Sequence, residues 1–308
     1  MKTVPNGVYP TMVTPFTDDY QVDYGALPAL LRWYEERGVT GVFAICQSSE
    51  IFYLSFEERL QILREIMRSR APGTVVLASG HTAYDPATQI KEAQAFIAEG
   101  IDAYVFISNR FAAKEEGEDA FLRRIEQVAK ALPDLPLGIY ECPYPYKRLL
   151  PPETIRRLGD IANFAFLKDT CCDLDQIKAK LEAAKSTGLK IYNANAAQLL
   201  ESLRLGCAGY SGVMANLHPQ LYVKLYECWE SDPALAGRLQ AFLGLASLAE
   251  CQMYPTNAKY TIALDGVPIT WKCRVPMKDE STKFRRCEEM QIEQLRDLAR
   301  EIEASYQK

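Results

Sequence analysis

Short apolar runs alternate with amphipathic segments along most of the chain, and this alternation limits the possible folds more than any other feature. Eight of these runs are rich in β-branched and aromatic residues, which is typical of buried parallel strands. They cover residues 8–13, 41–46, 75–78, 103–107, 137–140, 164–168, 190–193 and 208–212. Because parallel strands are joined by helical crossovers, eight strand–helix pairs predict an α/β protein with a closed (β/α)8 TIM barrel.

The segments between the runs carry the spacing of amphipathic helices. In the first segment Leu27, Leu30 and Leu31 fall on one helical face. Asp23 and Ser55 stand where the N-caps of the first two helices are expected. Further helices are predicted at 86–99, 118–131, 152–158, 174–184, 196–205 and 220–229.

The chain continues after the last predicted barrel helix. Ser231, Asp232 and Pro233 mark a boundary, so we expect a catalytic barrel over 1–230 and a helical C-terminal domain over 231–308. The second part is predicted to contain helices at 235–250, 257–264 and 281–306. No low-complexity linker separates the two parts, so the C-terminal part should pack on the barrel.

The charge balance disfavours two classes of partner. With 35 Lys and Arg against 40 Asp and Glu, the formal charge is -5, which provides no basic surface for nucleic acid or for a membrane. No apolar run approaches the roughly 18 residues that a membrane-spanning helix needs. We therefore expect neither nucleic acid nor a membrane as a partner.

The cysteines, histidines and glycines point away from cofactor chemistry. Nine cysteines are an odd number, and the first residues lack the apolar stretch of a signal peptide, so free thiols in the cytoplasm are predicted. There is no CxxC pair, and the two histidines, His81 and His218, lie far apart in sequence. Dinucleotide and phosphate-binding glycine motifs are also absent. The sequence thus predicts no metal and no cofactor.

Lys168 is the residue that most suggests catalysis, because barrel active sites lie at the carboxyl ends of the strands. Strand alternation points Phe164, Phe166, Lys168 and Thr170 the same way, and if that way is inward, an amine lies above an aromatic layer. Burial would lower the pKa of such a lysine and make it a nucleophile that forms Schiff bases. The alternative is that Lys168 begins a solvated loop, since most lysines are exposed.

Two further segments lie at strand ends. Tyr140 ends the preceding strand and could relay protons near an imine, or it could only fill the barrel mouth as one of 17 tyrosines. Residues 46–50, Cys-Gln-Ser-Ser-Glu, follow the second strand, and such turns bind carboxylates through hydroxyl and backbone N–H groups. The alternative is an ordinary loop whose serines cap local backbone, with Cys46 a buried structural cysteine.

Taken in order, these segments resemble the dihydrodipicolinate synthase and N-acetylneuraminate lyase family of class I, pyruvate-type aldolases. The resemblance covers nearly the whole chain. It lies in Pro-Thr-Met-Val-Thr-Pro-Phe at 10–16, Cys-Gln-Ser-Ser-Glu at 46–50, Tyr-Glu-Cys-Pro at 140–143, Phe-Leu-Lys-Asp-Thr at 166–170 and Gly-Tyr-Ser-Gly-Val-Met-Ala-Asn at 209–216.

The resemblance implies roles for particular residues. Lys168 would form the imine, Tyr140 would relay protons, and Ser48 would hold the keto-acid carboxylate with help from backbone N–H groups. The predicted substrate-binding residues are Gln47, Ser48, Ser49, Thr170, Gly209 and Ser211. Family members are commonly tetramers, so a homo-oligomer, either a tetramer or a dimer, is expected.

Departures from the family pattern concern the substrate more than the fold. Gln47 and Ser49 alter the G-[TS]-T-G-E turn, and Pro145 stands where the synthases have the arginine that grips the aldehyde. No tyrosine occurs at 107–110, where synthases borrow one across a dimer interface, and Ala196 and Ala197 replace the acidic pair of sialic acid lyases.

The leading hypothesis is a Schiff-base-forming lyase, an aldolase acting on pyruvate or a related 2-keto acid. One alternative is a dehydratase of a sugar acid that uses the same imine. Another is a family member that binds a keto acid without turning it over.

Overall fold

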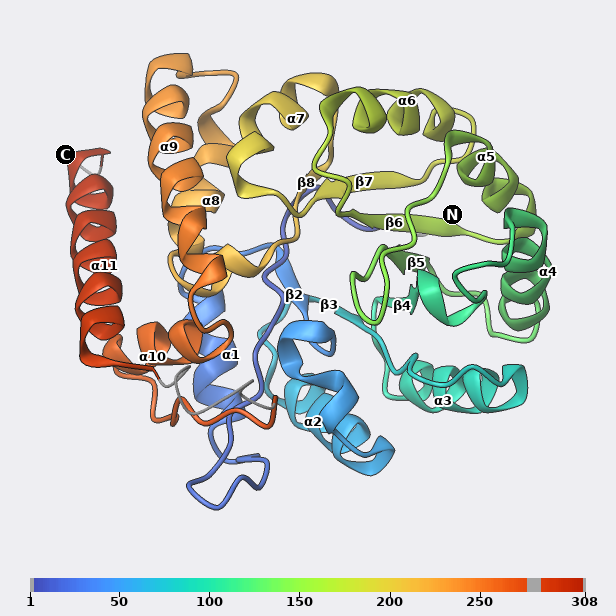
Figure 1. The fold of residues 1–308 in the computed structure, drawn as a ribbon, viewed down its shortest axis with the longest axis horizontal. Coiled ribbons are helices and arrows are strands. Elements are labelled where there is room, and N and C mark those ends of the chain that lie inside the picture. Colours follow the sequence, from blue (N-terminus) through green and yellow to red (C-terminus); the bar gives the residue numbers. More distant parts are fainter. Residues whose placement is uncertain (1–2, 276–283, 307–308) are drawn as a thin grey trace.

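Eight parallel strands form a nearly closed barrel surrounded by helices, as Figure 1 shows for this computed structural model. The structure describes residues 3–275 and 284–306. The strands are β1 (Gly7–Val8), β2 (Gly41–Phe43), β3 (Val75–Ala78), β4 (Ala103–Ile107), β5 (Leu137–Tyr140), β6 (Phe164–Asp169), β7 (Lys190–Asn193) and β8 (Gly209–Tyr210). Their order is β1-β8-β7-β6-β5-β4-β3-β2, and a parallel bridge between Thr11 and Phe43 connects the two ends. The predicted TIM barrel is confirmed.

Three strands are shorter than predicted. The run at 8–13 contributes only β1 and the bridge at Thr11, in part because Pro10 has no N–H to donate to a ladder. The runs at 41–46 and 208–212 are likewise reduced to β2 and β8. Where β8 meets β1 the backbones approach closely: a Cβ at Gly209, whose φ is +155°, would lie 1.8 Å from the Gly7 carbonyl oxygen. Only glycine fits there.

Each strand is followed by a helix on the outside of the barrel. These helices are α1 (Leu27–Glu35), α2 (Phe56–Ser69), α3 (Pro86–Ala98), α4 (Glu118–Ala129), α5 (Pro152–Ile161), α6 (Leu174–Ala184), α7 (Leu199–Leu205) and α8 (Pro219–Cys228). Ser55 caps α2, with Glu58 completing a capping box. The prediction that Asp23 caps α1 is wrong, because α1 begins four residues later, at Leu27.

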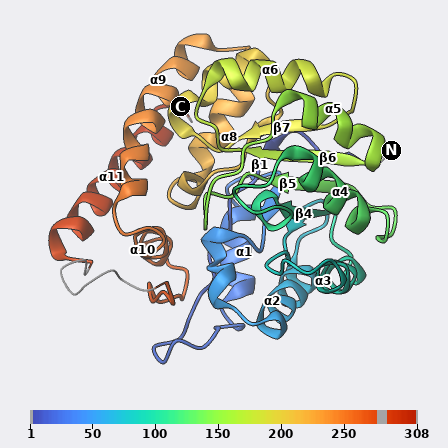
Figure 2. The same cartoon turned by 45° about the vertical axis from the view of Figure 1, so that its right-hand side comes forward.

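Three helices follow the barrel: α9 (Pro233–Ala246), α10 (Thr256–Leu264) and α11 (Arg286–Tyr306). Residues 281–283 of the last predicted helix lie outside the described residues. Asp265, after α10, accepts hydrogen bonds from Trp33 of α1, from Arg37 just after α1 and from Arg296 of α11. The C-terminal part therefore packs on the barrel as predicted, and Figure 2 shows α10 and α11 beside it. The division into domains at residue 230 stays a prediction.

Aromatic rings fill the barrel below its carboxyl-terminal end. Phe166 of β6 packs against Tyr192 at 4.6 Å, Tyr9 at 6.1 Å and Phe43 at 6.2 Å between ring centroids. All four side chains are fully buried. The strand alternation expected for β6 thus places Phe166 inward, and the residue two positions later, Lys168, points the same way.

Candidate active site

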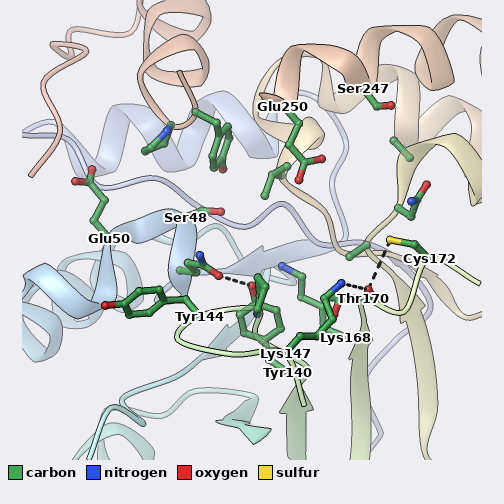
Figure 3. A pocket seen from close by; sticks show the side chains of 18 of the residues that line it. Ser48, Glu50, Tyr140, Tyr144, Lys147, Lys168, Thr170, Cys172, Ser247 and Glu250 are labelled. Atoms are coloured by element: carbon green, nitrogen blue, oxygen red, sulfur yellow. Dashed lines mark hydrogen bonds between the residues drawn. The ribbon is translucent and has the colours of Figure 1, made fainter. Parts of the chain in front are cut away.

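A cavity of about 860 Å³ opens at the carboxyl ends of the strands. The ends of β5 and β6 and the loops after β2 and β7 line it, and residues 247–255 and Val275 contribute from the C-terminal part. Figure 3 shows the labelled side chains converging on this space. The cavity lies where a parallel barrel holds its active site.

Lys168 lies at the base of this cavity and is 3% exposed. Its Nζ is 4.3 Å from the ring centroid of Tyr140 and 5.9 Å from that of Phe43. Burial lowers its pKa from the usual value, because the surroundings disfavour the ammonium form. The alternative of a solvated loop lysine is therefore wrong.

Lys168 differs from the other buried lysines of the described chain, Lys180 and Lys259. The ammonium of Lys180 pairs with two carboxylates, and that of Lys259 pairs with Glu50 at 2.7 Å. Lys168 has no ion-pair or hydrogen-bond partner among the described residues, and its Nζ lies over the rings of Tyr140 and Phe43. Burying an ammonium group without a carboxylate partner costs free energy. Of the three buried lysines in the described chain, Lys168 is therefore the one that most readily loses its proton to become a neutral amine.

Tyr140 lies beside Lys168 because the two residues are register partners in β5 and β6. Its hydroxyl donates to Gln47 Oε1 at 3.1 Å, and the Cys142 thiol reaches the same oxygen at 3.3 Å. Burial raises the pKa of Tyr140 well above 10, so the phenol stays protonated at neutral pH. Gln47, predicted as a substrate ligand, thus holds the Tyr140 hydroxyl in this structure.

The turn after β2 forms the 3-10 helix η1 (Gln47–Ser49). Ser48 lines the cavity and donates to Thr11 Oγ1 at 2.9 Å. Ser49 is fully buried, and its hydroxyl donates to the carbonyls of Met12 and Ala44. Its N–H donates to Cys46 O at 3.1 Å, so Ser49 supports the turn whereas Ser48 faces the cavity.

Of the remaining predicted substrate-binding residues, Thr170 lines the cavity, and Gly209 and Ser211 do not. Thr170 lines the cavity, with its hydroxyl donating to Glu141 O at 2.7 Å. Gly209 lies in β8 against β1 and does not line the cavity. Ser211 is buried outside the cavity lining, and its hydroxyl is unpaired among the described residues.

A buried charge cluster lies behind the two candidate catalytic residues. Glu141 and Asp169 follow Tyr140 and Lys168 directly, so strand alternation turns them away from the barrel interior. Lys180 of α6 bridges them, with Nζ 2.6 Å from Glu141 Oε1 and 2.6 Å from Asp169 Oδ2. Glu141 also accepts from the backbone N–H groups of Leu150 and Thr170. The cluster ties the ends of β5 and β6 together.

The ionisation of this cluster reflects burial opposed by pairing. Burial, with a contribution from Asp169, raises the pKa of Glu141 to about 7, while Lys180 acts in the opposite direction. Burial alone would lower the pKa of Lys180, but the attraction of both carboxylates outweighs it and the pKa is raised. The Lys180 ammonium therefore favours the charged form of Glu141 against the effect of burial.

Replacing Lys180 with methionine is expected to destabilise the protein by about 3–5 kcal/mol, because two buried carboxylates lose their shared cation. The pKa of Glu141 in the folded state then rises further, so the folded protein binds more protons than the unfolded chain and the loss is smaller at about pH 5 than at about pH 8. Urea unfolding measures both effects. Lys178→Met, at an exposed position of the same helix, is the control. A loss below about 1 kcal/mol at both pH values would contradict this account.

A second buried ion pair fixes the C-terminal part over the cavity rim. Lys259 of α10 donates to Glu50 Oε1 and to Lys272 O, each at 2.7 Å. The other carboxylate oxygen of Glu50 accepts from the N–H of Val275 at 2.8 Å. Glu50 has φ +60°, the left-handed conformation in which η1 ends. This pair holds residues 272–275 against the loop after β2.

Sequence reasoning missed several groups of the site. Glu141 and Asp169 were signalled by charges beside Tyr140 and Lys168 in otherwise apolar strand ends. Glu250 and Tyr254 carried no comparable signal, because they reach the cavity from the C-terminal part. Tyr254 Oη accepts from Asn216 Nδ2 at 2.8 Å, which links it to the late glycine-rich segment.

Three further observations on the described residues concern metal binding, disulfide formation and membrane-spanning helices. No group of three or more His, Cys, Asp or Glu side chains within them is placed to hold a metal ion. All nine cysteines are free. Within residues 3–275 and 284–306, no helix has both the length and the apolar character required to cross a bilayer.

The fold and the site define a class: a (β/α)8 barrel with a buried, unpaired lysine beside a tyrosine at its carboxyl-terminal end. The model of the dihydrodipicolinate synthetase family matches residues 4–295. The chain belongs to this family, as the sequence motifs indicate.

Known relatives agree with this assignment. A 4-hydroxy-tetrahydrodipicolinate synthase of Thiobacillus denitrificans is 26% identical, with 85% of this chain and 84% of that protein covered. An uncharacterized DapA-like lyase of Pyrococcus horikoshii is also 26% identical, over 92% of this chain and 99% of that protein. The family and these names support a lyase.

Solved structures share the fold. YagE of E. coli, solved in complex with pyruvate, aligns with a TM-score of 0.83 at 24% identity, covering 97% of this chain and 98% of that one. The dihydrodipicolinate synthase of Acinetobacter baumannii, also complexed with pyruvate, has a TM-score of 0.85 at 24% identity and covers 96% and 99% of the two chains.

Proposed function

We propose that this protein is a Schiff-base-forming lyase that binds pyruvate or a related 2-keto acid on Lys168 and makes or breaks the adjacent carbon–carbon bond. The observation that carries the proposal is the contrast among the three lysines that are buried within the described residues: Lys180 and Lys259 are paired with carboxylates, and Lys168 is not. Its lowered pKa supplies the neutral amine that attacks a carbonyl.

The chemistry proceeds through an imine. The Lys168 amine adds to the C2 carbonyl of the keto acid, and the resulting carbinolamine loses water to give a protonated imine. When the C3–C4 bond breaks, its electron pair moves into the imine and forms an enamine, while the C4 hydroxyl loses its proton to leave an aldehyde. We assign the proton relay of these steps to Tyr140, whose ring centroid lies 4.3 Å from the Lys168 Nζ.

The keto-acid carboxylate is assigned to the turn after β2. Ser48 faces the cavity with its hydroxyl and stands beside Gln47, which holds the Tyr140 hydroxyl. Thr170, two residues beyond Lys168, lines the same space. We also propose a cytoplasmic homo-oligomer, a dimer or a tetramer; the free cysteines support the reducing compartment and the family supports the assembly.

Dehydration of a sugar acid would begin with the same imine, whereas a protein that only binds keto acids would need no acid–base partner. The adjacency of Tyr140 and Lys168 favours turnover over binding alone. Separating lyase from dehydratase requires identification of the released product.

Borohydride reduction in the presence of pyruvate tests the proposal. We expect one adduct per chain by intact mass, located on Lys168 by peptide mapping, because reduction converts the imine to a stable secondary amine. Lys180 and Lys259 are internal controls: both are buried, and both are held as ammonium groups by carboxylates. The absence of an adduct, or its location on another lysine, would refute the assignment.

A further inference from the structure

Glu250 presents a solvent-exposed carboxylate to the cavity, without a protein partner among the described residues. It belongs to the 3-10 helix η6 (Ser247–Cys251), which follows α9. Figure 3 shows its carboxylate extending from η6 into the space above Lys168. Within the part of the chain that the structure describes, it has no hydrogen-bond or ion-pair partner. Glu50, the other acid lining the cavity, is instead paired with Lys259 and two backbone N–H groups.

Two ammonium groups share the cavity with Glu250. Lys168 and Lys147 both attract its carboxylate and oppose the rise in pKa that burial causes. Lys147 otherwise donates only to the Thr170 carbonyl, at 2.8 Å. With a keto acid bound, the protonated imine offsets the keto-acid carboxylate, and Lys147 offsets Glu250. The site is then electrically balanced, and a second substrate carboxylate would lack a counter-charge.

No arginine of the described chain lines the cavity to bind such a carboxylate. Arg148 is buried and pairs with Glu118 at 2.9 Å. Arg110 lies over the rings of Phe52 and Tyr84, at 4.7 and 4.6 Å from their centroids. Neither of these guanidinium groups lines the cavity, so the bidentate fork suited to a carboxylate is absent from its lining.

The rest of the cavity suits a small uncharged molecule with both apolar and polar surface. Phe52 and Tyr144, whose centroids lie 5.1 Å apart, provide aromatic wall beside Val275. Asn195 and Thr170 add neutral polar groups. Apolar walls with a few placed polar groups are typical of small-molecule sites, in which the polar groups fix orientation.

We propose that Glu250 selects the aldehyde half of the substrate: it accepts a hydrogen bond from a hydroxyl group and repels a second carboxylate. The substrate class is therefore a 2-keto acid whose distal part is uncharged and hydroxylated. This inference rests on the proposed aldolase function and adds the chemical class of the acceptor.

The test compares two keto acids that differ only at the distal carbon. One is 4,5-dihydroxy-2-oxopentanoate, which ends in a hydroxymethyl group, and the other is 4-hydroxy-2-oxoglutarate, which ends in a carboxylate. Initial cleavage rates give kcat/KM for each compound. Where cleavage is slow, borohydride trapping from an equimolar mixture gives the ratio of the two adducts by mass.

We expect the unmodified protein to favour the hydroxymethyl compound by about tenfold or more, because like charges in contact are strongly disfavoured. E250Q should shift this ratio toward the dicarboxylate by about tenfold, since it removes the repulsion and frees Lys147 to bind the carboxylate. E250D, which keeps the charge, should retain the preference. Glu227→Gln removes the same charge at an exposed position of α8 and is the matched control.

Two results would overturn the inference: a preference of the unmodified protein for the dicarboxylate, or a ratio unchanged in E250Q relative to Glu227→Gln. Failure of the proposed function would look different, because the unmodified protein would then form no reducible adduct with pyruvate. Pyruvate trapping in the same preparation separates the two cases.

Discussion

Lys168→Ala is expected to abolish both borohydride trapping of pyruvate and turnover while leaving the fold intact. The substitution removes the only nucleophile that we assign to the cavity, and neither Lys180 nor Lys259 can replace it because both are held by carboxylates. Intact mass after reduction measures trapping, and circular dichroism with urea unfolding measures the fold.

The free energy of unfolding should not fall in Lys168→Ala, because the pKa of Lys168 is lowered in the folded protein. Burial lowers the pKa of Lys168 in the folded protein, so between that pKa and the pKa of an exposed lysine the unfolded chain keeps its proton while the folded protein has lost it. The lysine therefore costs stability at neutral pH, and the cost disappears as pH rises toward the value of an exposed lysine. Lys168→Ala should be at least as stable as the parent near neutral pH, with the difference shrinking at higher pH.

The same pKa shift predicts how trapping depends on pH. The rate should rise with pH through the lowered pKa of Lys168 and level off before the range in which exposed lysines titrate. Lys178→Ala, on the surface of α6, is the control for general loss of an amine. Retained turnover or a retained adduct in Lys168→Ala would show that the imine forms elsewhere.

Tyr140→Phe is expected to slow turnover by about 10² to 10⁴ while pyruvate binding is largely kept, which is the usual effect of losing one acid–base group. The ring, which packs against Phe43 at 6.0 Å and under Lys168, is retained. Only the hydroxyl that donates to Gln47 is lost. Steady-state kcat and the dependence of trapping on pyruvate concentration separate the chemical step from binding.

Tyr192→Phe provides a matched comparison. Tyr192 is also buried and lies in the aromatic layer, but its hydroxyl donates to the Pro5 carbonyl at 2.8 Å, away from the cavity. This variant should leave kcat nearly unchanged. A collapse of pyruvate affinity in Tyr140→Phe with normal turnover at saturation would make Tyr140 a binding residue and contradict the relay role.

Local sequence pattern was sufficient for the regular parts of the barrel. The strands at 75–78, 103–107, 137–140 and 190–193 and the helix at 174–184 have the predicted limits, because each is a short apolar run or an amphipathic segment bounded by turn residues. The strands predicted around Pro10 and Gly209 are longer than the strands that the structure contains there. There the pairing depends on the missing N–H of Pro10 and on the close approach of Gly7, which hydrophobicity does not encode.

For the site, the sequence pointed to Lys168 and Tyr140 because both end predicted strands and strand alternation fixes which residues share a face. The structure shows that this face is the inward one. Gln47, Ser48 and Thr170 were also indicated, since they lie at or just beyond strand ends. Ser49 was predicted on the same grounds, whereas Gly209 and Ser211 were predicted from the family resemblance. None of the three lines the cavity.

What the sequence by itself determined is therefore the barrel, the family and the inward-facing lysine and tyrosine, because each follows from the period of a strand or from a motif of adjacent residues. Only the tertiary structure decided the electrostatic state of the site. Lys180 reaches Glu141 from 39 residues away and Lys259 reaches Glu50 from 209 residues away, whereas Lys168 and Glu250 line one cavity without forming an ion pair. Such pairings depend on how distant segments pack, and no local pattern records which buried lysine is left without a carboxylate.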